Sequence, residues 1–503
     1  MSNVIKPITM YLPQFHRTPE NDEWWGEGFT EWTAVKKGER LFDGHDQPKV
    51  PFDGNYYDLL QKETMAQQAE LMKKYGVYGM CFYHYYFEDG RKVLHKPAEN
   101  LLEWKEIDMP YCFCWANESW GRTWSKLHTK NIWAEKFEKV KNHDDNGILL
   151  RQKYGMKEEW KKHFEYLLPF FKDKRYIRKD GRLVFLLYRP SSIYCVQQMI
   201  DYWQELAGQH GVGGFYFIGM NITQKKHGLD ALLLNAPLMF NQEIRYKEGG
   251  INKYSYDAVW KKILEAGPVK DSNTYYGGFV NYDDTPRRSK NGVVVDGFTP
   301  EKFKKYLGLL ARKNLESDNE YLFINAWNEW GEGMYLEPDV TYGFACLEAV
   351  KHVVDTVKNI PQKFHEIKKE NSTLQYYQNE VNRQKIIANC LDRWITLKEK
   401  QINPIEYIKE RNWDKIALYG MGKLGLHLVH ELAQCKEEAA YIIDKRSEMQ
   451  YPGIDVISPD DCFPDADVLI VTAVADFDEV YQKCKAKFSG DIISLEQIIY
   501  ECE

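Results

Sequence analysis

The sequence contains no apolar run long enough to form a membrane-spanning helix. Its opening residues, MSNVIKPITMYLPQF, include neither the basic region nor the apolar region of a secretory signal peptide. We therefore expect a cytoplasmic protein without an integral membrane segment.

The cysteines also lack the pattern of a disulfide framework or of a metal site. All ten occur singly, and the closest two, Cys112 and Cys114, would share one face of a strand. Neither an HExxH motif nor a CxxC pair is present, and the adjacent Asp283 and Asp284 would point to opposite faces of an extended segment. The sequence therefore predicts reduced thiols and no bound metal.

No excess of positive charge is present either. The 67 Lys and Arg residues are interspersed with 74 Asp and Glu residues, and the formal net charge is -7, which argues against a nucleic-acid partner. Aromatic residues, by contrast, make up 15% of the chain, and many Trp and Tyr residues cluster in loop-like stretches. Such rings stack on the apolar faces of sugars, so this pattern favours a carbohydrate-binding cleft.

Short apolar runs predict an α/β fold. Eight of them alternate with stretches whose apolar residues have helical spacing, as in β/α units. The predicted strands cover residues 5–12, 75–87, 108–116, 182–189, 213–220, 229–236, 274–282 and 319–328. Eight strands within about 340 residues predict a (β/α)8 TIM barrel with insertions, which we assign to residues 1–360.

The pattern changes after the barrel. Residues 361–412 are polar, charged and nearly free of Gly and Pro, which predicts a helical connector that could pair two chains into a homo-oligomer. From residue 413 a strand pattern resumes as KIALYG, followed by GMGKLG, a helical stretch and the strand AAYIID. This order predicts a small Rossmann-like α/β domain over residues 413–503.

A glycine motif opens this last domain. Gly420, Gly422 and Gly425 form GxGxxG after a strand, and Asp444 ends the next strand, where a ribose-binding acid would lie. Two interpretations remain open. The glycines could hold a nucleotide or nucleotide-sugar, or they could serve only the close packing of helix on strand. For the barrel we predict no cofactor.

Polar and aromatic residues follow every predicted barrel strand, at the end where barrels of this type carry their active sites. The predicted substrate contacts are Tyr11, Gln14, His16, Trp24, Trp25, Trp32, Tyr83, His84, Trp115, Asn117, Glu118, Tyr188, Arg189, Asn241, Asp283, Trp327, Asn328 and Trp330. For the three tryptophans of the first loop the alternative is a structural loop inserted into the barrel rim. For His16 and His84 it is a structural side chain with satisfied hydrogen bonds.

The most specific pattern is WNEWGEG, after the last barrel strand. It places Glu329 and Glu332 three residues apart, framed by Trp and Gly, so both could face one cavity. Breaking a glycosidic bond requires a proton donor and a second carboxylate, and burial can separate the pKa values of such a pair. The alternative is a pair of solvated loop acids. The position at a strand end favours the catalytic interpretation.

Six segments connect these residues with a known family. They are YLPQFH (11–16), NDEWWGEGFTEW (21–32), GVYGMCFYHYYF (76–87), CWANESW (114–120), NYDDTPRR (281–288) and NAWNEWGEGMYLEPD (325–339). With these motifs the first 350 residues or so resemble the WbsX-type glycosyltransferases of bacterial surface-polysaccharide clusters. That family is related to the endo-α-mannosidases of glycoside hydrolase family 99.

The resemblance implies roles for the two acids. The related mannosidases are retaining enzymes. By analogy, Glu329 would act as a base on the substrate 2-hydroxyl, which attacks the anomeric carbon to give an anhydrosugar. Glu332 would be the general acid and then the base that activates the acceptor. The C-terminal domain resembles nucleotide-sugar-binding modules found beside enzymes of polysaccharide assembly.

These observations lead us to expect an enzyme that forms or rearranges glycosidic bonds in O-antigen or capsule assembly, with an oligosaccharide or nucleotide-sugar as its partner. Two alternatives stay open. One is a glycoside hydrolase, similar to an endo-α-mannosidase, that cleaves an oligosaccharide. The other is a glycan-binding protein without catalysis.

Overall fold

The computed structural model describes residues 4–121, 148–226, 228–237, 239–240, 245–248, 250–357, 372–446, 451 and 453–502. The chain divides into two compact units, residues 1–192 with 200–365, and residues 193–199 with 366–503. Among the described residues, no helix combines the length and the apolarity needed to cross a membrane.

The first unit is built on a sheet of parallel strands, in the order β13-β10-β9-β8-β4-β2-β1-β16-β14. Their bounds are β1 (Lys6–Tyr11), β2 (Gly79–Tyr86), β4 (Tyr111–Trp115), β8 (Arg182–Leu187), β9 (Phe215–Met220), β10 (Ala231–Leu234), β13 (Asn273–Tyr276), β14 (Gly278–Phe279) and β16 (Tyr321–Asn325). Only Gly277 separates β13, which pairs with β10, from β14, which pairs with β16. One chain segment therefore joins both ends of the sheet, and the predicted parallel α/β barrel is confirmed at this level.

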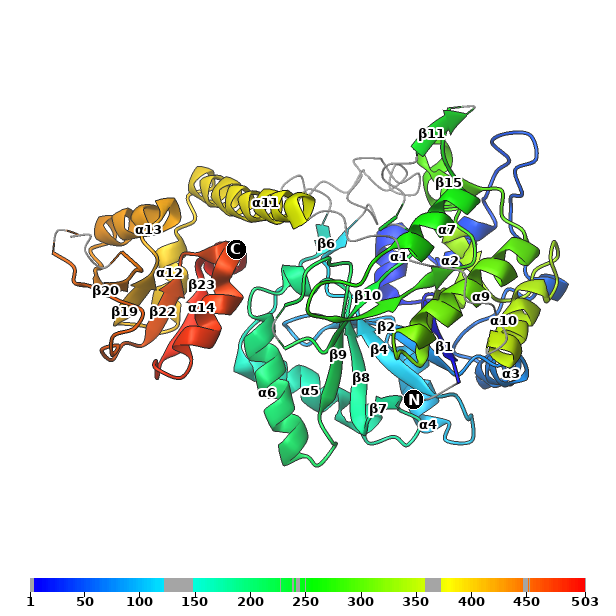
Figure 1. Ribbon diagram of the computed structural model, residues 1–503, viewed down its shortest axis with the longest axis horizontal. Helices are drawn as coiled ribbons and strands as arrows, with labels where there is room; N and C mark the ends of the chain where they lie inside the picture. The colour runs from blue at the N-terminus through cyan, green and yellow to red at the C-terminus, as the bar shows by residue number, and fades with distance from the viewer. Residues whose placement is uncertain are drawn as a thin grey trace. The chain divides into compact units, whose positions relative to one another are not determined.

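Helices cover the outside of these strands (Figure 1). They are α3 (Lys62–Lys74), α4 (Lys96–Glu103), α5 (Lys157–Phe171), α6 (Val196–Gln209), α7 (Tyr256–Glu265), α9 (Pro300–Glu316) and α10 (Ala345–Thr356). In α9, for example, the Thr299 side chain accepts from the backbone N–H of Lys302 and Pro300 opens the first turn, two features that favour a helix start. Its apolar residues Phe303 and Leu307 are buried, as the helical spacing predicts.

The loops between barrel strands carry short elements that form the candidate site. They are α1 (Pro19–Trp25), α2 (Glu31–Val35), α8 (Thr285–Arg288), β17 (Asn328–Glu329), the 3-10 turn η5 (Trp330–Glu332) and β18 (Met334–Tyr335). A separate small sheet consists of β11 (Arg245–Glu248), β12 (Ile251–Ser255) and β15 (Val293–Asp296). The insertions expected in the barrel are therefore mainly in these connections.

The second unit contains a five-stranded parallel sheet, in the order β21-β20-β19-β22-β23. Its strands are β19 (Ile416–Tyr419), β20 (Ala439–Ile443), β21 (Val456–Ile457), β22 (Val468–Val471) and β23 (Asp491–Ser494). Its helices are α11 (Ser372–Glu399), α12 (Pro404–Glu410), α13 (Lys423–Gln434), α14 (Phe477–Cys484) and α15 (Leu495–Glu501). On one face, Phe477 and Val480 of α14 pack on Tyr419 and Tyr441.

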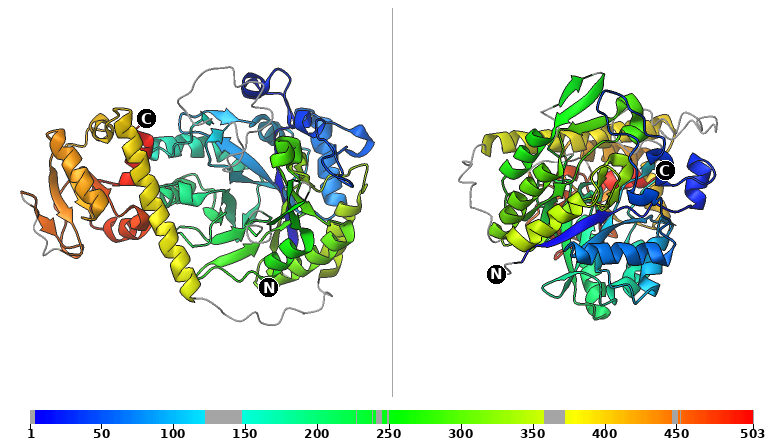
Figure 2. Two further views of the ribbon diagram at one scale, coloured as in Figure 1. Left: turned by 90° about the horizontal axis from the view of Figure 1, so that it is seen from above. Right: turned by 90° about the vertical axis from the view of Figure 1, so that its right-hand side faces the viewer.

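The predicted connector is described from residue 372 onward, and its residues 361–371 lie outside the described residues. Helix α11 is a straight rod, drawn in yellow in Figure 2, and it belongs with α12 to the second compact unit. The finer assignment to a Rossmann-like domain, the predicted domain boundaries and the pairing of chains through the connector stay predictions.

Candidate active site

Glu329 and Glu332 lie on a tight turn directly beyond β16. Strands β17 and β18 pair in antiparallel register, with Asn328 opposite Tyr335 and Glu329 opposite Met334, and η5 connects them. Gly333 closes the turn with φ 58°, a left-handed conformation that favours glycine. Glu329 is buried, whereas the Glu332 side chain keeps 22% of its surface exposed. The two acids thus share a rigid turn but differ in access to solvent.

One arginine joins both acids. Arg287 of α8 donates from Nη1 to Glu332 Oε1 at 2.5 Å and from Nη2 to Glu329 Oε2 at 3.2 Å. The guanidinium is buried and also contacts a third carboxylate, Glu31 of α2, which accepts from Nε at 2.8 Å and lies 2.7 Å from Nη2. A single positive charge therefore serves three carboxylates, two from the turn beyond β16 and one from the loop after β1.

A missing side chain makes this arrangement possible. A Cβ atom at Gly331 would lie 1.8 Å from Glu31 Oε1 and 2.8 Å from Arg287 Nε. Such distances are far inside van der Waals contact, so only glycine allows the η5 backbone to pass this close to the ion pair. The glycine between the two glutamates is thereby explained.

We expect Gly331→Ala to displace Glu31 and to destabilise the barrel by about 1–3 kcal/mol, as overpacking of a close-packed site does. The measurement is urea unfolding followed by circular dichroism. Gly267→Ala is the matched control, because a Cβ at Gly267 meets nothing within 4 Å. Equal unfolding free energies for the two variants would contradict the close approach.

Asp283 holds α8 in place. Its Oδ2 accepts from His45 at 2.9 Å and from Gln47 at 2.7 Å, and its Oδ1 accepts from the backbone and the hydroxyl of Thr285, the first residue of α8. The Asp283 backbone N–H also donates to the Glu332 carbonyl at 2.6 Å. The Asp283 carboxylate is thus occupied by protein donors and orients the helix that carries Arg287, and its contact with a substrate stays a prediction.

Burial and like charge act together on the acids of the site. Burial, and then the neighbouring Glu332, raises the pKa of Glu329 to about 8 despite Arg287. Burial also raises the pKa of Glu31, while Arg287 opposes this effect. Burial disfavours the charge of Arg287, but the three carboxylates raise its pKa well above the usual value. Burial and the neighbouring acid thus favour the neutral form of Glu329, whereas the three carboxylates favour the charged form of Arg287.

Tyrosines line the same region. Tyr83 and Tyr188 are partly exposed, with ring centroids 6.1 Å apart, and Tyr85 is buried beside them. Burial raises the pKa values of Tyr83 and Tyr85 well above 10, and the Glu329 carboxylate adds to this effect in both. These hydroxyls thus stay protonated next to the acids and can donate hydrogen bonds to sugar oxygens.

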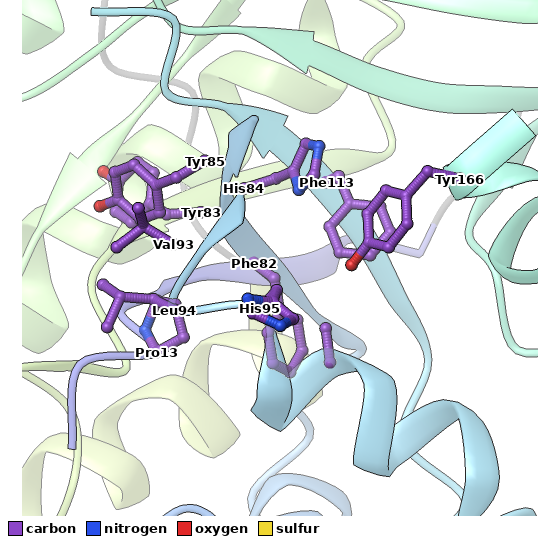
Figure 3. Close-up of a pocket in the computed structure, with 11 residues that line it drawn as sticks. Pro13, Phe82, Tyr83, His84, Tyr85, Val93, Leu94, His95, Phe113 and Tyr166 are labelled. Carbon is purple, nitrogen blue, oxygen red and sulfur yellow. The ribbon is translucent and has the colours of Figure 1, made fainter. Parts of the chain in front are cut away.

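Three residues predicted as contacts have side chains on the other side of the sheet from Tyr83 and Tyr85, and their role as substrate contacts stays a prediction. Along β2 the side chains alternate, so Tyr83 and Tyr85 project to one side and His84 to the other, as Figure 3 shows. His84 Nε2 lies 2.8 Å from His163 Nε2 of α5. Trp115 packs on His163 as well. Tyr11 donates to Gln68 of α3 at 2.6 Å. All three side chains lie between the strands and the outer helices.

The cavity in Figure 3 is a packing gap beside β2. It is lined by side chains from both sides of the strand, among them Tyr83, His84 and Tyr166, and holds about one water molecule. It is too small for a sugar. Burial lowers the pKa of His84 to about 3, so this histidine stays neutral in its pocket.

The two asparagines predicted as contacts, Asn117 and Asn328, connect backbone segments through hydrogen bonds. Asn117 donates to the Arg189 carbonyl and accepts from the Arg189 N–H, each at 2.8 Å. Asn328 does the same for Leu12, at 3.0 and 2.8 Å. Both amides are fully buried. They join the ends of neighbouring barrel strands, and their contact with a ligand stays a prediction.

Most of the tryptophans predicted as contacts pack against or donate to other groups of the protein. Trp32 donates to the Tyr57 carbonyl at 2.8 Å, and Trp330 stacks on Tyr335 with centroids 3.7 Å apart. Of the tryptophans predicted as contacts, the buried ones are Trp25, Trp32, Trp115, Trp327 and Trp330. Trp25 and Trp32 are packed inside the first loop, as its structural interpretation expects, while Trp24 stays partly exposed and packs near Trp120.

The remaining predicted contacts divide into buried and accessible residues. Gln14 and His16 are buried; the Gln14 carbonyl accepts from the Glu31 N–H at 3.1 Å, and burial lowers the pKa of His16 to about 4. Glu118 and Arg189 are partly exposed and form an ion pair at 2.8 Å. Asn241 lies outside the described residues. The described accessible set is Trp24, Tyr83, Glu118, Tyr188, Arg189 and Glu332.

A second buried acid supports the turn from behind. Glu337 accepts from Tyr57 at 2.7 Å, from Gln68 at 2.7 Å and from Trp330 at 2.6 Å. Burial raises the pKa of Glu337 to about 7, although these hydrogen bonds oppose the shift. Because the folded state binds this proton more tightly than the unfolded state, its contribution to stability is complete below about pH 4.5 and is lost as pH rises through 7.

We expect Glu337→Gln to reduce the loss of stability between pH 5 and 8, since the amide does not titrate and its oxygen can still accept from Tyr57 and Trp330. Glu337→Ala should lower stability by about 3 kcal/mol across that range, because buried donors lose their acceptor. Thermal unfolding of both variants at several pH values measures this. A Gln variant with the wild-type pH dependence would contradict the assignment.

In the second unit, the predicted nucleotide-site residues lie together at the end of β19. Gly420 has φ 95°, and Asp444 Oδ2 accepts from the backbone N–H of Met421, within the glycine motif, at 2.7 Å. A Cβ at Gly425 would lie 2.2 Å from the Gly420 carbonyl, whereas one at Gly422 would meet nothing within 4 Å. Close packing thus explains Gly425, and nucleotide binding stays a prediction.

Four residues of the site region were missed by the sequence-based prediction: Glu31, Tyr85, Arg287 and Glu337. Glu31, Arg287 and Glu337 lie inside the motifs FTEW, DDTPRR and MYLEPD, but nothing in those motifs shows that they meet. Tyr85 follows from strand alternation once Tyr83 faces the site. Among the described residues, no three His, Cys, Asp or Glu side chains gather closely enough to hold a metal ion.

Comparisons with known proteins agree with the sequence motifs. Residues 7–350 match the family model described as Glycosyltransferase WbsX. Two relatives named WxcX, from two strains of Xanthomonas campestris pv. campestris, are 30% identical over 366 residues, which is 70% of this chain and 50% of theirs. The chain thus spans about half the length of these curated relatives.

Two solved structures align with much of this chain. The GH99 endo-alpha-mannosidase from Bacteroides thetaiotaomicron aligns with 70% of this chain and 97% of its own, with 14% identity and a TM-score of 0.43. A glycoside hydrolase-like protein aligns with 70% of this chain and 94% of its own, with 13% identity and a TM-score of 0.47.

Proposed function

Because the chain belongs to the family of the glycosyltransferase WbsX, we propose that it forms or rearranges glycosidic bonds, with Glu329 and Glu332 as the proton-transferring groups. The observation that carries the proposal is the pair of acids on one turn, joined by Arg287, one buried and one open to solvent. We place the reaction in the cytoplasmic assembly of a surface polysaccharide such as O-antigen or capsule.

The chemistry requires two carboxyl groups in different protonation states. When a glycosidic bond breaks, one carboxyl gives its proton to the leaving oxygen, and the other carboxylate takes the proton of the attacking hydroxyl. The pair then holds as many protons as before. The raised pKa of Glu329 and the ion pair of Glu332 with Arg287 support a pair that shares one proton near neutral pH.

The division of roles is a separate question. The resemblance to mannosidases implies that Glu329 is the base and Glu332 the acid, and this stays a prediction. Burial of Glu329 favours the proton on Glu329 while the site is empty. In this proposal the incoming sugar therefore moves the shared proton to Glu332 before the leaving oxygen departs.

The accessible residues support a sugar as the ligand. Tyr83, Tyr188 and Trp24 offer partly exposed rings, and the two tyrosine hydroxyls lie close to the acids. Arg189 and Glu118 add charged hydrogen-bonding groups near Tyr188. Rings for stacking combined with a few charged groups are typical of carbohydrate sites.

The donor decides between the leading function and its hydrolase alternative. Purified protein would be incubated with nucleotide-sugars and with α-mannosides, and released nucleotide and released sugar would be followed separately. Nucleotide release that requires an acceptor sugar would establish a transferase. Sugar release without nucleotide would establish a hydrolase. In both cases the Glu329→Gln/Glu332→Gln double variant should be inactive.

The third candidate, a glycan-binding protein without catalysis, predicts binding of an oligosaccharide by wild type with no product from any donor.

Nucleotide-sugar binding by the second unit is part of the leading proposal, a glycosyltransferase. It is supported by the open space at Gly422 and by the position of the glycine loop at the carboxyl end of β19, beside β22. Calorimetric titration of the full chain with a nucleotide-sugar tests it.

A further inference from the structure

Glu31 is a buried carboxylate that has no role in the proton transfers proposed for Glu329 and Glu332. It lies in the long loop after β1, far from the other acids in sequence, and is only 1% exposed. Its backbone N–H donates to the Gln14 carbonyl at 3.1 Å, and the next residue, Trp32, is anchored on Tyr57. The carboxylate is therefore held in place by its own loop as well as by Arg287.

The position of Glu31 fixes the direction of the guanidinium. Its Oε1 accepts from Nε of Arg287 and lies 2.7 Å from Nη2, so it occupies one edge of the planar group. Nη1 and the remaining hydrogen of Nη2 are then aimed at Glu332 and Glu329. Because the guanidinium is a rigid fork, holding one edge determines where the other donors point.

Glu31 also determines how much of the positive charge the other two acids experience. One guanidinium faces three carboxylates. Nearby, Arg288 pairs with Asp284, and His45 lies 2.9 Å from Asp283. Within the part of the chain that the structure describes, the other titratable groups near the acids include the tyrosines Tyr83, Tyr85, Tyr188 and Tyr282, together with the pair Glu118–Arg189. Removing the charge of Glu31 therefore leaves Arg287 to Glu329 and Glu332.

We infer that Glu31 is a positioning residue that acts through Arg287 to keep the proton of the acid pair on Glu329 in the empty site. The inference deepens the proposed function and rests on it for its kinetic meaning, while the geometry stands by itself. When Glu31 is charged, Arg287 stabilises the ionised form of Glu329 less than it would if Glu31 were neutral. Without it, Arg287 attracts the Glu329 carboxylate more strongly and the proton is released at lower pH.

Glu31→Gln separates charge from geometry, because the amide oxygen can still accept from Nε and Nη2 of Arg287. Glu27→Gln is the matched control. It changes the same charge in the same loop, but Glu27 is 85% exposed and pairs with Arg17. Glu31→Asp keeps the charge at a longer distance from Arg287.

The first readout requires no substrate. In wild type, the folded state binds the Glu329 proton more tightly than the unfolded state, so stability falls as pH rises from about 4.5 toward 8. In Glu31→Gln this loss of stability should be complete at a pH about one unit lower than in wild type. Thermal unfolding from pH 4 to 9 measures the shift. A curve that is lower than that of wild type at every pH but parallel to it would mean a merely structural role and would overturn the inference.

The second readout is the pH–rate profile on a donor that wild type turns over. The apparent pKa that Glu329 contributes to this profile should fall by about one unit in Glu31→Gln and should not change in Glu27→Gln. An unchanged apparent pKa in Glu31→Gln, or equal shifts in both variants, would refute the positioning role. If wild type turns over no donor, the proposed function fails, and the unfolding curves still decide the role of Glu31.

If Glu31→Gln does not fold, Glu31→Asp replaces it in both measurements. Its weaker hold on Arg287 should give a smaller shift in the same direction. A pH dependence identical to that of wild type would then contradict the inference.

Discussion

Replacing Glu332 by Gln is expected to lower kcat by about 10³-fold while sugar binding stays within a few fold of wild type. The amide fills the same space and can still accept from Arg287, but it neither gives nor takes a proton. Glu329→Gln should reduce kcat by a similar factor, and the double variant should be little worse than either single variant, because residues that act as one unit are not additive. Steady-state kinetics with binding calorimetry on the same preparations measures both quantities.

Glu165→Gln is the control for these variants. Glu165 lies on α5, half exposed and paired only with Lys161 on its own helix, so its loss should leave kcat unchanged. A Glu332→Gln enzyme with wild-type kcat would remove Glu332 from the chemistry. A large fall in sugar affinity with unchanged kcat would make it a binding residue instead.

The second large effect concerns Arg287. Arg287→Met should destabilise the first unit by about 3–5 kcal/mol near pH 8, because it leaves Glu31 and Glu329 buried without their cation. At pH 5 the loss should be smaller, since both acids have raised pKa values and can take up protons. Urea unfolding at the two pH values measures the difference.

Arg312→Met is the comparison for Arg287→Met. Arg312 forms a partly exposed pair with Glu316 on α9, for which a change of at most about 1 kcal/mol is expected. If Arg287→Met changed stability as little as Arg312→Met, or equally at both pH values, the ion cluster would not be a buried charge network.

The sequence predicted the barrel and the place of the acid pair because both depend on local patterns. Apolar runs of strand length mark the barrel strands, and a Gly-rich segment after the last one marks a turn at its end. Glu329 and Glu332 were predicted as the catalytic acids for this reason, and that role stays a proposal. The hydrogen bonds of the strand-end asparagines were not predicted, because Asn117 and Asn328 bind backbone groups that come from other strands.

The rest of the site could not be predicted because it depends on long-range contacts. Glu31 and Arg287 meet through loops that follow different strands, and a single sequence carries no signal for such a contact. Tyr83 and His84 were both predicted as contacts although adjacent strand residues face opposite sides, because the sequence does not show which face of β2 points inward. Trp32 and Trp330 resemble sugar-stacking rings in sequence, but they pack on each other with centroids 5.5 Å apart.

The most direct test of the central claim is a time course of product formation by wild type and by Glu329→Gln/Glu332→Gln, with nucleotide-sugars and α-mannosides as donors and oligosaccharide binding measured in parallel. The account predicts that wild type forms a product from one donor class and that the double variant binds the sugar but forms no product above background. Equal product formation by both proteins, or binding without turnover by wild type on every donor, would contradict it.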